Sequence, residues 1–481
     1  MTSPSAHGAP AAGAAAPPAA LRRSLTAVEL AALIFFTTCG GPYGLEPLVG
    51  AVGPAWSVVL ILATPLLWSL PVALMVAELA AMMPAEGGYY IWVRDALGPF
   101  WAVQESWWTL TSSLAIIATY PILFTGYLGY FLPDLVGPNA SDPALAAWIR
   151  HGVSIAVIAS VTYVNLRGSS AVGRSATGTA IFVVGAFALM VIYGVFSGGS
   201  ATTIGTVLAT DMKTEHHGVL LLGLSLVVFN FSGWDNASTY AGEVEEPRRT
   251  YPRALAIALA GLMLSYLVPI LVGVGVTVDP AVWTPDAGWP VIARKIGGGV
   301  FGGLIALGGL VSMWSLLNAQ MLYVSRVPFV MALDGWFPVL FARASARTGA
   351  PSTAILALGV LGVAMTFLSF EGLTVIYCLL YTAGLTLEFI ALVLLRRKRP
   401  DALRPFRVPG GTTGLAVVCV LPAIVAAGVV YATLKEWRNY GVPFAIMGVI
   451  AVFGVAIYFL RVRHFHRAIA SATLPGPTAD P

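Results

Sequence analysis

From residue 37 to residue 47 the sequence reads Thr37-Thr38-Cys39-Gly40-Gly41-Pro42-Tyr43-Gly44-Leu45-Glu46-Pro47. This stretch interrupts the first long apolar segment, because residues 28–36 and 48–52 on either side are apolar. Glycine and proline are the residues least able to continue a helix. In hydrocarbon an unpaired backbone N–H or C=O costs several kcal/mol, so a break of this kind needs protein, water or a ligand to satisfy it. The stretch is therefore the first candidate binding site.

The composition is that of a membrane protein. Of the 481 residues, 58% are hydrophobic and only 10% are charged, and the mean hydropathy is +0.83. Soluble domains carry about 25% charged residues. Apolar runs long enough to cross a bilayer recur along the chain. We therefore predict an all-α polytopic membrane protein without a soluble domain.

Several chemistries are disfavoured by the sequence. It contains no Gly-Lys dipeptide and hence no P-loop. The three cysteines, Cys39, Cys378 and Cys419, are far apart, and the six histidines fall in predicted tails or loops or, for His151, at the end of a predicted span. We expect no metal, no cofactor, no nucleic-acid partner and no enzymatic activity, since no nucleophile–base pair appears.

The hydropathy pattern predicts twelve spans within a transporter domain of residues 25–466. Residues 1–24 and 467–481 are predicted to be cytoplasmic tails, the first of them disordered because it is rich in Ala and Pro. The predicted spans are residues 28–50, 56–82, 99–130, 148–165, 176–197, 218–241, 252–278, 300–324, 352–369, 373–395, 413–433 and 441–461.

The basic residues set the predicted orientation. With a cytoplasmic N-terminus, 20 of the 26 lysines and arginines fall on the cytoplasmic side. This bias follows the positive-inside rule. We expect a multi-pass protein of the cell membrane with both termini in the cytoplasm and lipids around it.

The sixth span repeats the opening feature. Its apolar residues 220–230 are followed by Phe231-Ser232-Gly233-Trp234-Asp235-Asn236, in which Asp235 or Asn236 could cap a second half-helix. Interrupted segments at matching places in two halves indicate a transporter built from inverted repeats. The predicted repeats are residues 28–197 and 218–395, with the last two spans, 413–461, outside them.

Each break has an alternative interpretation. A single Gly/Pro break can be a kink that neighbouring helices close, but two breaks five spans apart favour a binding site. In that interpretation the end of the first half-helix offers carbonyls to a cation or ammonium. The half-helices that follow the breaks face anionic groups.

Carboxyl groups inside the spans are the second indication of a site, because charge at membrane depth is costly and usually functional. Asp235 is a candidate ligand or proton site, against the alternative of a helix cap. Glu46 could meet an incoming ammonium or be an interfacial charge. Glu105 could be a proton relay or a structural hydrogen-bond acceptor. For Glu78 and Glu388, nearer the cytoplasmic ends, we expect snorkelling or pairing with loops.

Other side chains are weaker candidates for the binding site. Trp234 could gate the site or stack on a cation, and Tyr120, Tyr377 and Tyr381 could line a cavity or be core. The loop of residues 242–253 has three acidic and three arginine residues that could form salt bridges which open and close, or could simply be solvated.

The order of these motifs resembles the amino acid–polyamine–organocation superfamily. The resemblance rests on Gly40 to Glu46, Ala77 to Ala80, Glu86 to Val93, Gly98 to Trp101, Gln104-Glu105, Trp234-Asp235, Ala241 to Val244, Glu388 and Arg404 to Pro409. It is greatest to the polyamine uptake branch, which is related to the L-type amino acid transporters. It implies a LeuT-like 5+5 fold with substrate at broken helices 1 and 6, and proton-coupled uptake or exchange.

The resemblance implies that the substrate binds to residues at both breaks. Two positions depart from its pattern: Ile116-Ile117 stand where plant polyamine carriers have Asp-Asn, and span 5 lacks the lysine that some members use in place of sodium. The implied substrate-binding residues are Gly40, Gly41, Gly44, Glu46, Phe231, Ser232, Gly233, Trp234 and Asp235, with Asp235 and Glu105 as candidate proton-coupling residues.

The sequence thus predicts a secondary-active permease for amino acids or polyamines, driven by protons. The alternatives are an amine or amino acid exchanger and a non-transporting nutrient sensor, which would need a larger signalling domain. A channel is disfavoured by the paired breaks.

Overall fold

The computed structural model describes residues 24–196, 201–212, 220–284, 288–367, 370–435 and 441–472. The predicted tails lie almost entirely outside these residues. Within them the chain is helical, and the only β-type pairings are two isolated bridges. The helices in order are α1 Ala27–Thr38, α2 Glu46–Val52, α3 Pro54–Thr64, the π-helix η1 Pro65–Ser69, α4 Leu70–Met82, α5 Tyr89–Leu97, α6 Pro99–Gly129, α7 Pro133–Val136, α8 Pro143–Leu166, α9 Ser169–Phe196, α10 Ala201–Asp211, α11 Leu220–Asn230, the 3₁₀-helices η2 Asn236–Thr239 and η3 Ala241–Glu243, α12 Pro247–Val276, α13 Gly288–Leu333, the 3₁₀-helix η4 Val339–Ala342, α14 Ser352–Met365, α15 Phe370–Lys398, α16 Gly411–Lys435 and α17 Gly441–Ala472.

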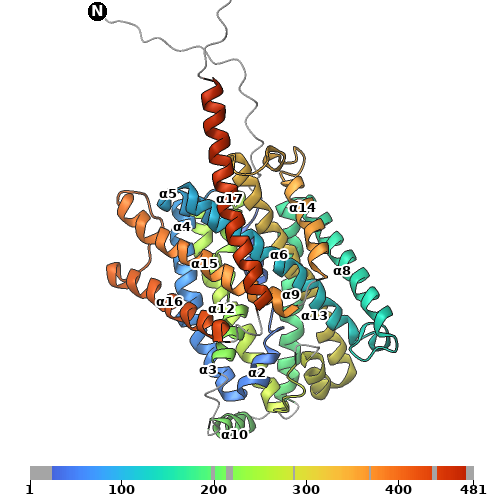
Figure 1. Ribbon diagram of the computed structural model, residues 1–481. Helices are drawn as coiled ribbons and strands as arrows, with labels where there is room; N and C mark the ends of the chain where they lie inside the picture. Colours follow the sequence, from blue (N-terminus) through green and yellow to red (C-terminus); the bar gives the residue numbers. More distant parts are fainter. Residues whose placement is uncertain are drawn as a thin grey trace, which may run out of the picture.

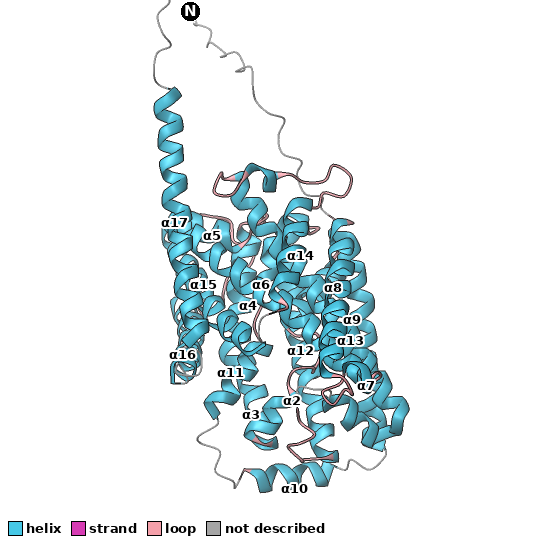
Figure 2. Ribbon diagram, turned by 45° about the vertical axis from the view of Figure 1, so that its right-hand side comes forward, coloured by secondary structure: helices cyan, strands magenta, loops and turns pink. Residues whose placement is uncertain are grey.

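Nine helices of the described part are long and apolar enough to cross a membrane. Helices α1 and α14 are apolar but shorter. The chain is therefore a multi-pass membrane protein, while the total of twelve spans and the inverted repeat stay predictions. Helix α10, at the lower end of the bundle in Figures 1 and 2, falls in a region for which no helix was predicted.

Helix α6 lies at the centre of the bundle, where it packs along both α13 and α15 (Figure 1). Two of the long helices depart from regular geometry. Helix α13 bends where Gly297 and Gly298 leave helical dihedrals, and η1 inserts a π-helical turn between α3 and α4 next to Pro65. Both departures occur at residue types that commonly cause kinks.

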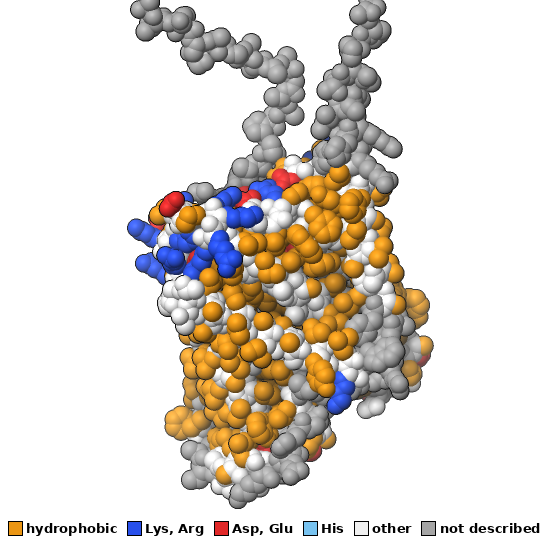
Figure 3. All heavy atoms as spheres, turned by 60° about the vertical axis from the view of Figure 1, so that its left-hand side comes forward, with side chains coloured by type: hydrophobic (Ala, Val, Ile, Leu, Met, Phe, Trp, Pro, Cys, Tyr) orange, Lys and Arg blue, Asp and Glu red, His pale blue; other side chains and the backbone are white. Residues whose placement is uncertain are grey.

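The described chain begins and finishes at the same end of the molecule, the upper end in Figures 1 and 2; we call this the terminal face. Figure 3 shows Lys and Arg side chains gathered near this end, above a broad hydrophobic surface. Exposed basic residues at the end of α15 and in the following loop include Arg397, Lys398, Arg399 and Arg407. Such an arrangement suits a protein surrounded by lipid below its terminal face.

Candidate binding site at two broken helices

The first predicted break is present. Helix α1 begins with a capping box, in which Thr26 and Glu29 satisfy each other's backbone N–H groups, and it ends at Thr38. Gly40, Gly41 and Gly44 then adopt φ angles of 70°, 98° and 88°, in the region that favours glycine. The helix resumes as α2 at Glu46.

Neighbouring side chains occupy three carbonyls of this break. Ser312 of α13 donates to the Gly40 carbonyl. The Trp289 indole donates to Pro42 O at 2.9 Å, and the Asn230 amide donates to Gly44 O at 3.1 Å. Each of these three carbonyls therefore accepts a hydrogen bond from a side chain of the protein, as a kink closed by neighbouring helices would require.

Glu46 lies where the break returns to helix. It is fully buried, so the interpretation as an interfacial charge is wrong. Its Oε2 accepts from Gly44 N–H at 2.7 Å, and its Oε1 accepts from the Tyr127 hydroxyl at 3.1 Å. The carboxylate thus accepts a hydrogen bond from the Gly44 N–H, which the break had left without a helical partner. A negative charge near the start of a helix is also favourable, because the helix dipole is positive there.

The second break is also present, but its second half differs from the prediction. Helix α11 ends at Asn230, and after residues 231–235 the chain forms the short 3₁₀-helices η2 and η3 rather than an α-helix. Asp235 precedes η2, yet its side chain makes no capping bond. The carboxylate is bonded to α15 instead, because Tyr381 donates to Asp235 Oδ1 at 2.5 Å.

Tyr381 connects the acid to the broken backbone. Its hydroxyl also accepts from Gly233 N–H at 2.9 Å. Gly233 has a φ of 103°, and a Cβ there would collide with Thr37 O at the end of α1. Only glycine fits this approach, so the two breaks lie directly against each other, as the Asn230–Gly44 hydrogen bond also shows.

The other residues proposed for the second break are buried beside it. Trp234 is fully buried, and its indole donates to Phe231 O at 2.9 Å. Ser232 donates back to Val228 O at 2.7 Å. Each of these polar groups thus has a protein partner, and Trp234 does not stand over an open space.

Asp235 has no basic partner. Among the described residues, no lysine or arginine makes an ion pair with it, although it is only 2% exposed. The nearby Thr38 hydroxyl is buried and has no hydrogen-bond partner in the described structure. A buried acid and an unused hydroxyl therefore lie at the junction of the two breaks, where a cationic group would be stabilised.

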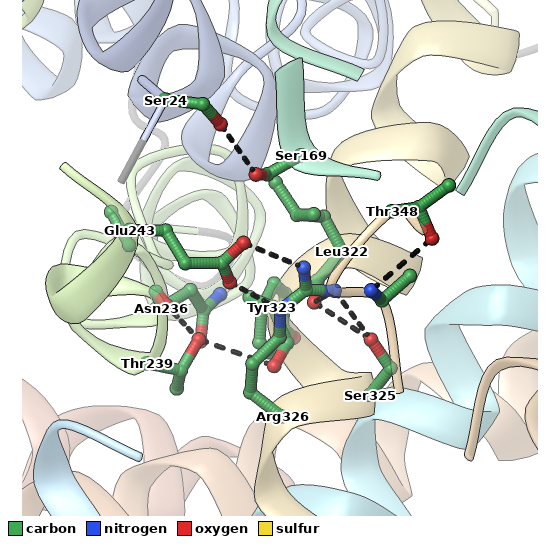
Figure 4. Close-up of polar contacts among 12 residues, drawn as sticks. Ser24, Ser169, Asn236, Thr239, Glu243, Leu322, Tyr323, Ser325, Arg326 and Thr348 are labelled. Atoms are coloured by element: carbon green, nitrogen blue, oxygen red, sulfur yellow. Dashed lines mark hydrogen bonds and ion pairs between the residues drawn. The ribbon is translucent and has the colours of Figure 1, made fainter. Parts of the chain in front are cut away.

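Polar contacts join η3, α13, α9 and the start of the described chain beside η2 (Figure 4). Arg326 of α13, fully buried, pairs with Glu243 of η3 at 2.8 Å. Ser24 N–H donates to Glu243 O at 2.9 Å, and the Ser24 and Ser169 hydroxyls lie 3.2 Å apart. Of the two outcomes considered for the acidic loop, salt bridges or solvation, Glu243 therefore forms a salt bridge, and its partner comes from α13.

The remaining membrane acids divide into three cases. Glu78 pairs with Arg396 and with Arg404 of the following loop at 3.4 Å, which confirms the predicted pairing. Glu105 accepts from Thr109 at 2.9 Å and from Ser106 at 3.0 Å, as the structural alternative expects. Glu388 is 1% exposed and its Oε2 has no partner among the described residues, so the expected snorkelling is wrong.

One cavity lies elsewhere, between α15, α16 and η1. It measures about 300 Å³, and its lining of Trp68, Phe389, Cys419 and Pro422 with other apolar residues includes none of the predicted site residues. Its lining contains no charged side chain.

The sequence is similar to those of known transport proteins. A family model described as amino acid permease matches residues 25–453. Polyamine transporter PUT1 of Oryza sativa subsp. japonica is 34% identical over 476 residues, which cover 98% of this chain and 85% of that protein. Polyamine transporter RMV1 of Arabidopsis thaliana is 36% identical over 405 residues, 84% and 79% of the two chains. An uncharacterized transporter of Legionella pneumophila is 26% identical over 391 residues, 74% and 79%.

Proposed function

Since the chain belongs to the amino acid permease family of transporters, we propose that it is a secondary-active permease that carries polyamines or amino acids across the cell membrane, coupled to protons. Family and relatives are transporters of amino acids or polyamines rather than enzymes.

The proposed site is the junction of the two breaks. Its backbone comes from Gly40, Gly41 and Gly44 on one side and from Phe231, Ser232 and Gly233 on the other, with Glu46, Trp234 and Asp235 around it. The observation that carries the proposal is Asp235, a buried carboxylate at the junction without a basic partner in the described chain. An ammonium group of the substrate supplies that partner, which suits an amino acid and suits an amine equally well.

A polyamine is favoured over a neutral amino acid by two observations. The relatives named above as polyamine transporters match almost the whole chain. Two buried acids at the junction, Asp235 and Glu46, have no basic partner in the described structure and can face two ammonium groups, which offsets the lack of an acid at Ile116-Ile117. Ile117 itself packs against Gly362 of α14.

Access to the site requires movement. All residues from Phe231 to Val244 are buried, the Glu243–Arg326 pair closes the terminal face, and Trp289 with Tyr43 closes the opposite side through bonds to Pro42 O and Ile305 O. A transporter that alternates between two openings has such an occluded state. We place both termini in the cytoplasm because the basic residues gather at the terminal face.

The test is uptake into proteoliposomes. Labelled putrescine, spermidine and a panel of amino acids are offered with and without an inward proton gradient. We expect uptake of at least one amine, stimulated by the gradient. Asp235→Asn should lower amine uptake at least tenfold, because it removes the charge that faces the ammonium, whereas Asp134→Asn, an exposed acid on α7, should not. Absence of uptake of every compound by the wild-type protein would refute the proposed function.

A further inference from the structure

A second polar cluster lies between α6 and α15, separate from the broken segments. Glu105 Oε1 lies 3.7 Å from where a Cβ on Gly384 would stand. Glu388 follows Gly384 by four residues, so both are on the same face of α15. The two glutamates thus face one another across a helix pair that packs along its length.

Two buried polar atoms in this cluster have no hydrogen-bond partner in the described structure. They are Glu388 Oε2 and the hydroxyl of Tyr89, which is fully buried at the start of α5. The Tyr89 hydroxyl lies within electrostatic reach of Glu105, Asp235 and Glu388. Buried polar groups are normally paired, so these two atoms indicate an exchangeable occupant.

The groups that face Glu388 are acids and phenols. Glu105 of α6 and Asp235 before η2 lie within electrostatic reach of Glu388, and so does the phenol of Tyr89 of α5. On α15 the nearest arginine, Arg396, is two turns away and is paired with Glu78 of α4. On the remaining neighbours, Cys419 of α16 is an uncharged thiol and Tyr458 of α17 stacks on Trp336.

Unpaired carboxylates this close would repel one another and would lack solvation. A proton on Glu388 Oε2 removes one negative charge and provides the O–H donor that this atom lacks. The cluster is fully buried and closely packed, so a proton fits it without rearrangement, whereas a methylene chain carrying an ammonium does not.

The cluster is connected to the breaks through α15. Tyr381, which donates to Asp235, lies seven residues before Glu388, about 10 Å along the helix at 1.5 Å per residue. Asp235 also lies within electrostatic reach of Glu105 and of Glu388. When a cationic substrate binds to Asp235 or leaves it, the electrostatic potential at Glu388 therefore changes.

We propose that Glu388, with Glu105 and Tyr89, is the proton-binding site of the coupled cycle, a role that the breaks themselves do not fill. In each transport cycle, a hydronium ion from one side of the membrane gives its proton to Glu388 Oε2 and becomes water. A water molecule on the other side of the membrane later takes the proton from Glu388. No electron is transferred. The inference rests on the proposed function for its place in transport, but the site itself can be tested without substrate.

The first experiment measures protonation directly. Infrared difference spectra of the purified protein in lipid nanodiscs are recorded between acidic and alkaline buffer. We expect a protonated-carboxyl C=O band that Glu388→Gln removes and that Tyr89→Phe shifts through its lost hydrogen bond. Glu29→Gln, at the exposed start of α1, should change neither. An unchanged band in Glu388→Gln would overturn the proposal, even if the protein transports nothing.

The second experiment separates coupling from substrate binding. Uptake driven by a proton gradient is compared with exchange of labelled for unlabelled amine, which needs no net proton movement. In Glu388→Gln the ratio of uptake with the gradient to uptake without it should fall to about one. The rate of amine exchange should fall much less. If Glu388→Gln lowers the affinity for the amine tenfold but uptake is still stimulated by the gradient, Glu388 binds the ammonium of the substrate and the proposal is overturned. Should Glu388→Gln not fold, Tyr89→Phe provides the same comparison.

Discussion

Tyr381→Phe is the substitution that isolates the contact between the two breaks and α15. The change removes a single oxygen atom and leaves the ring, which stacks on Tyr377 with centroids 5.4 Å apart. Two hydrogen bonds are lost with that atom, one to Asp235 Oδ1 and one from Gly233 N–H. Both remaining groups are buried.

The expected cost follows from these two groups. Leaving a buried polar group unsatisfied costs about 1–3 kcal/mol, so two of them make about 2–6 kcal/mol of lost folding free energy. The entropy of unfolding is roughly 2.1 cal/mol/K per residue, which for a chain of this length is about 1 kcal/mol/K. The Tm should therefore fall by about 2–6 °C.

The assay is thermal unfolding of the purified protein in detergent, followed through the exposure of its buried cysteines to a thiol-reactive dye. Tyr377→Phe is the matched control, since its hydroxyl makes neither of the two contacts. Asp235→Asn with Tyr381→Phe should lower the Tm by less than the two single changes added, because the pair shares one bond. An unchanged Tm in Tyr381→Phe, or strict additivity, would show that this hydroxyl does not hold the broken segment.

Two further predictions concern the same region. Gly233→Ala places a Cβ against Thr37 O at a φ of 103°, which strains the backbone by about 1–3 kcal/mol before the clash is counted. The substitution should therefore lower the Tm by several degrees. Gly178→Ala on α9, where a Cβ meets nothing within 4 Å, should leave the Tm unchanged. Arg326→Met leaves Glu243 buried without its ion pair, at a cost of about 3–5 kcal/mol. Its Tm should fall by about 3–5 °C and should recover in part when Glu243→Gln is added; a double variant no more stable than Arg326→Met would contradict this.

Residue type alone made both breaks predictable. Glycine and proline within an apolar run cannot satisfy the backbone in hydrocarbon, and this holds whatever the tertiary structure is. The same argument identified Asp235 and Glu46 as buried acids that need a partner. Their positions beside Gly233 and Gly44 followed directly from chain proximity.

The partners could not be predicted, because they come from remote helices. A helix cap was the alternative considered for Asp235, but its carboxylate accepts a hydrogen bond from Tyr381, 146 residues away. Glu243 pairs with Arg326, 83 residues away, rather than with its neighbours in the loop. The burial of Glu388 was also missed, since its position near a helix end says nothing about the helices packed around it.

One helix holds both the site and the closure of the terminal face. After its bend, α13 carries Ser312, which donates to Gly40 O, and, fourteen residues later, Arg326, which pairs with Glu243. These contacts are about 21 Å apart along a continuous helix at 1.5 Å per residue. A shift of α13 along its axis as a rigid body would displace both contacts together. In the proposed cycle, we expect a movement of α13 that opens the terminal face to withdraw Ser312 from the first break as well and so to free the Gly40 carbonyl for the ammonium of the substrate.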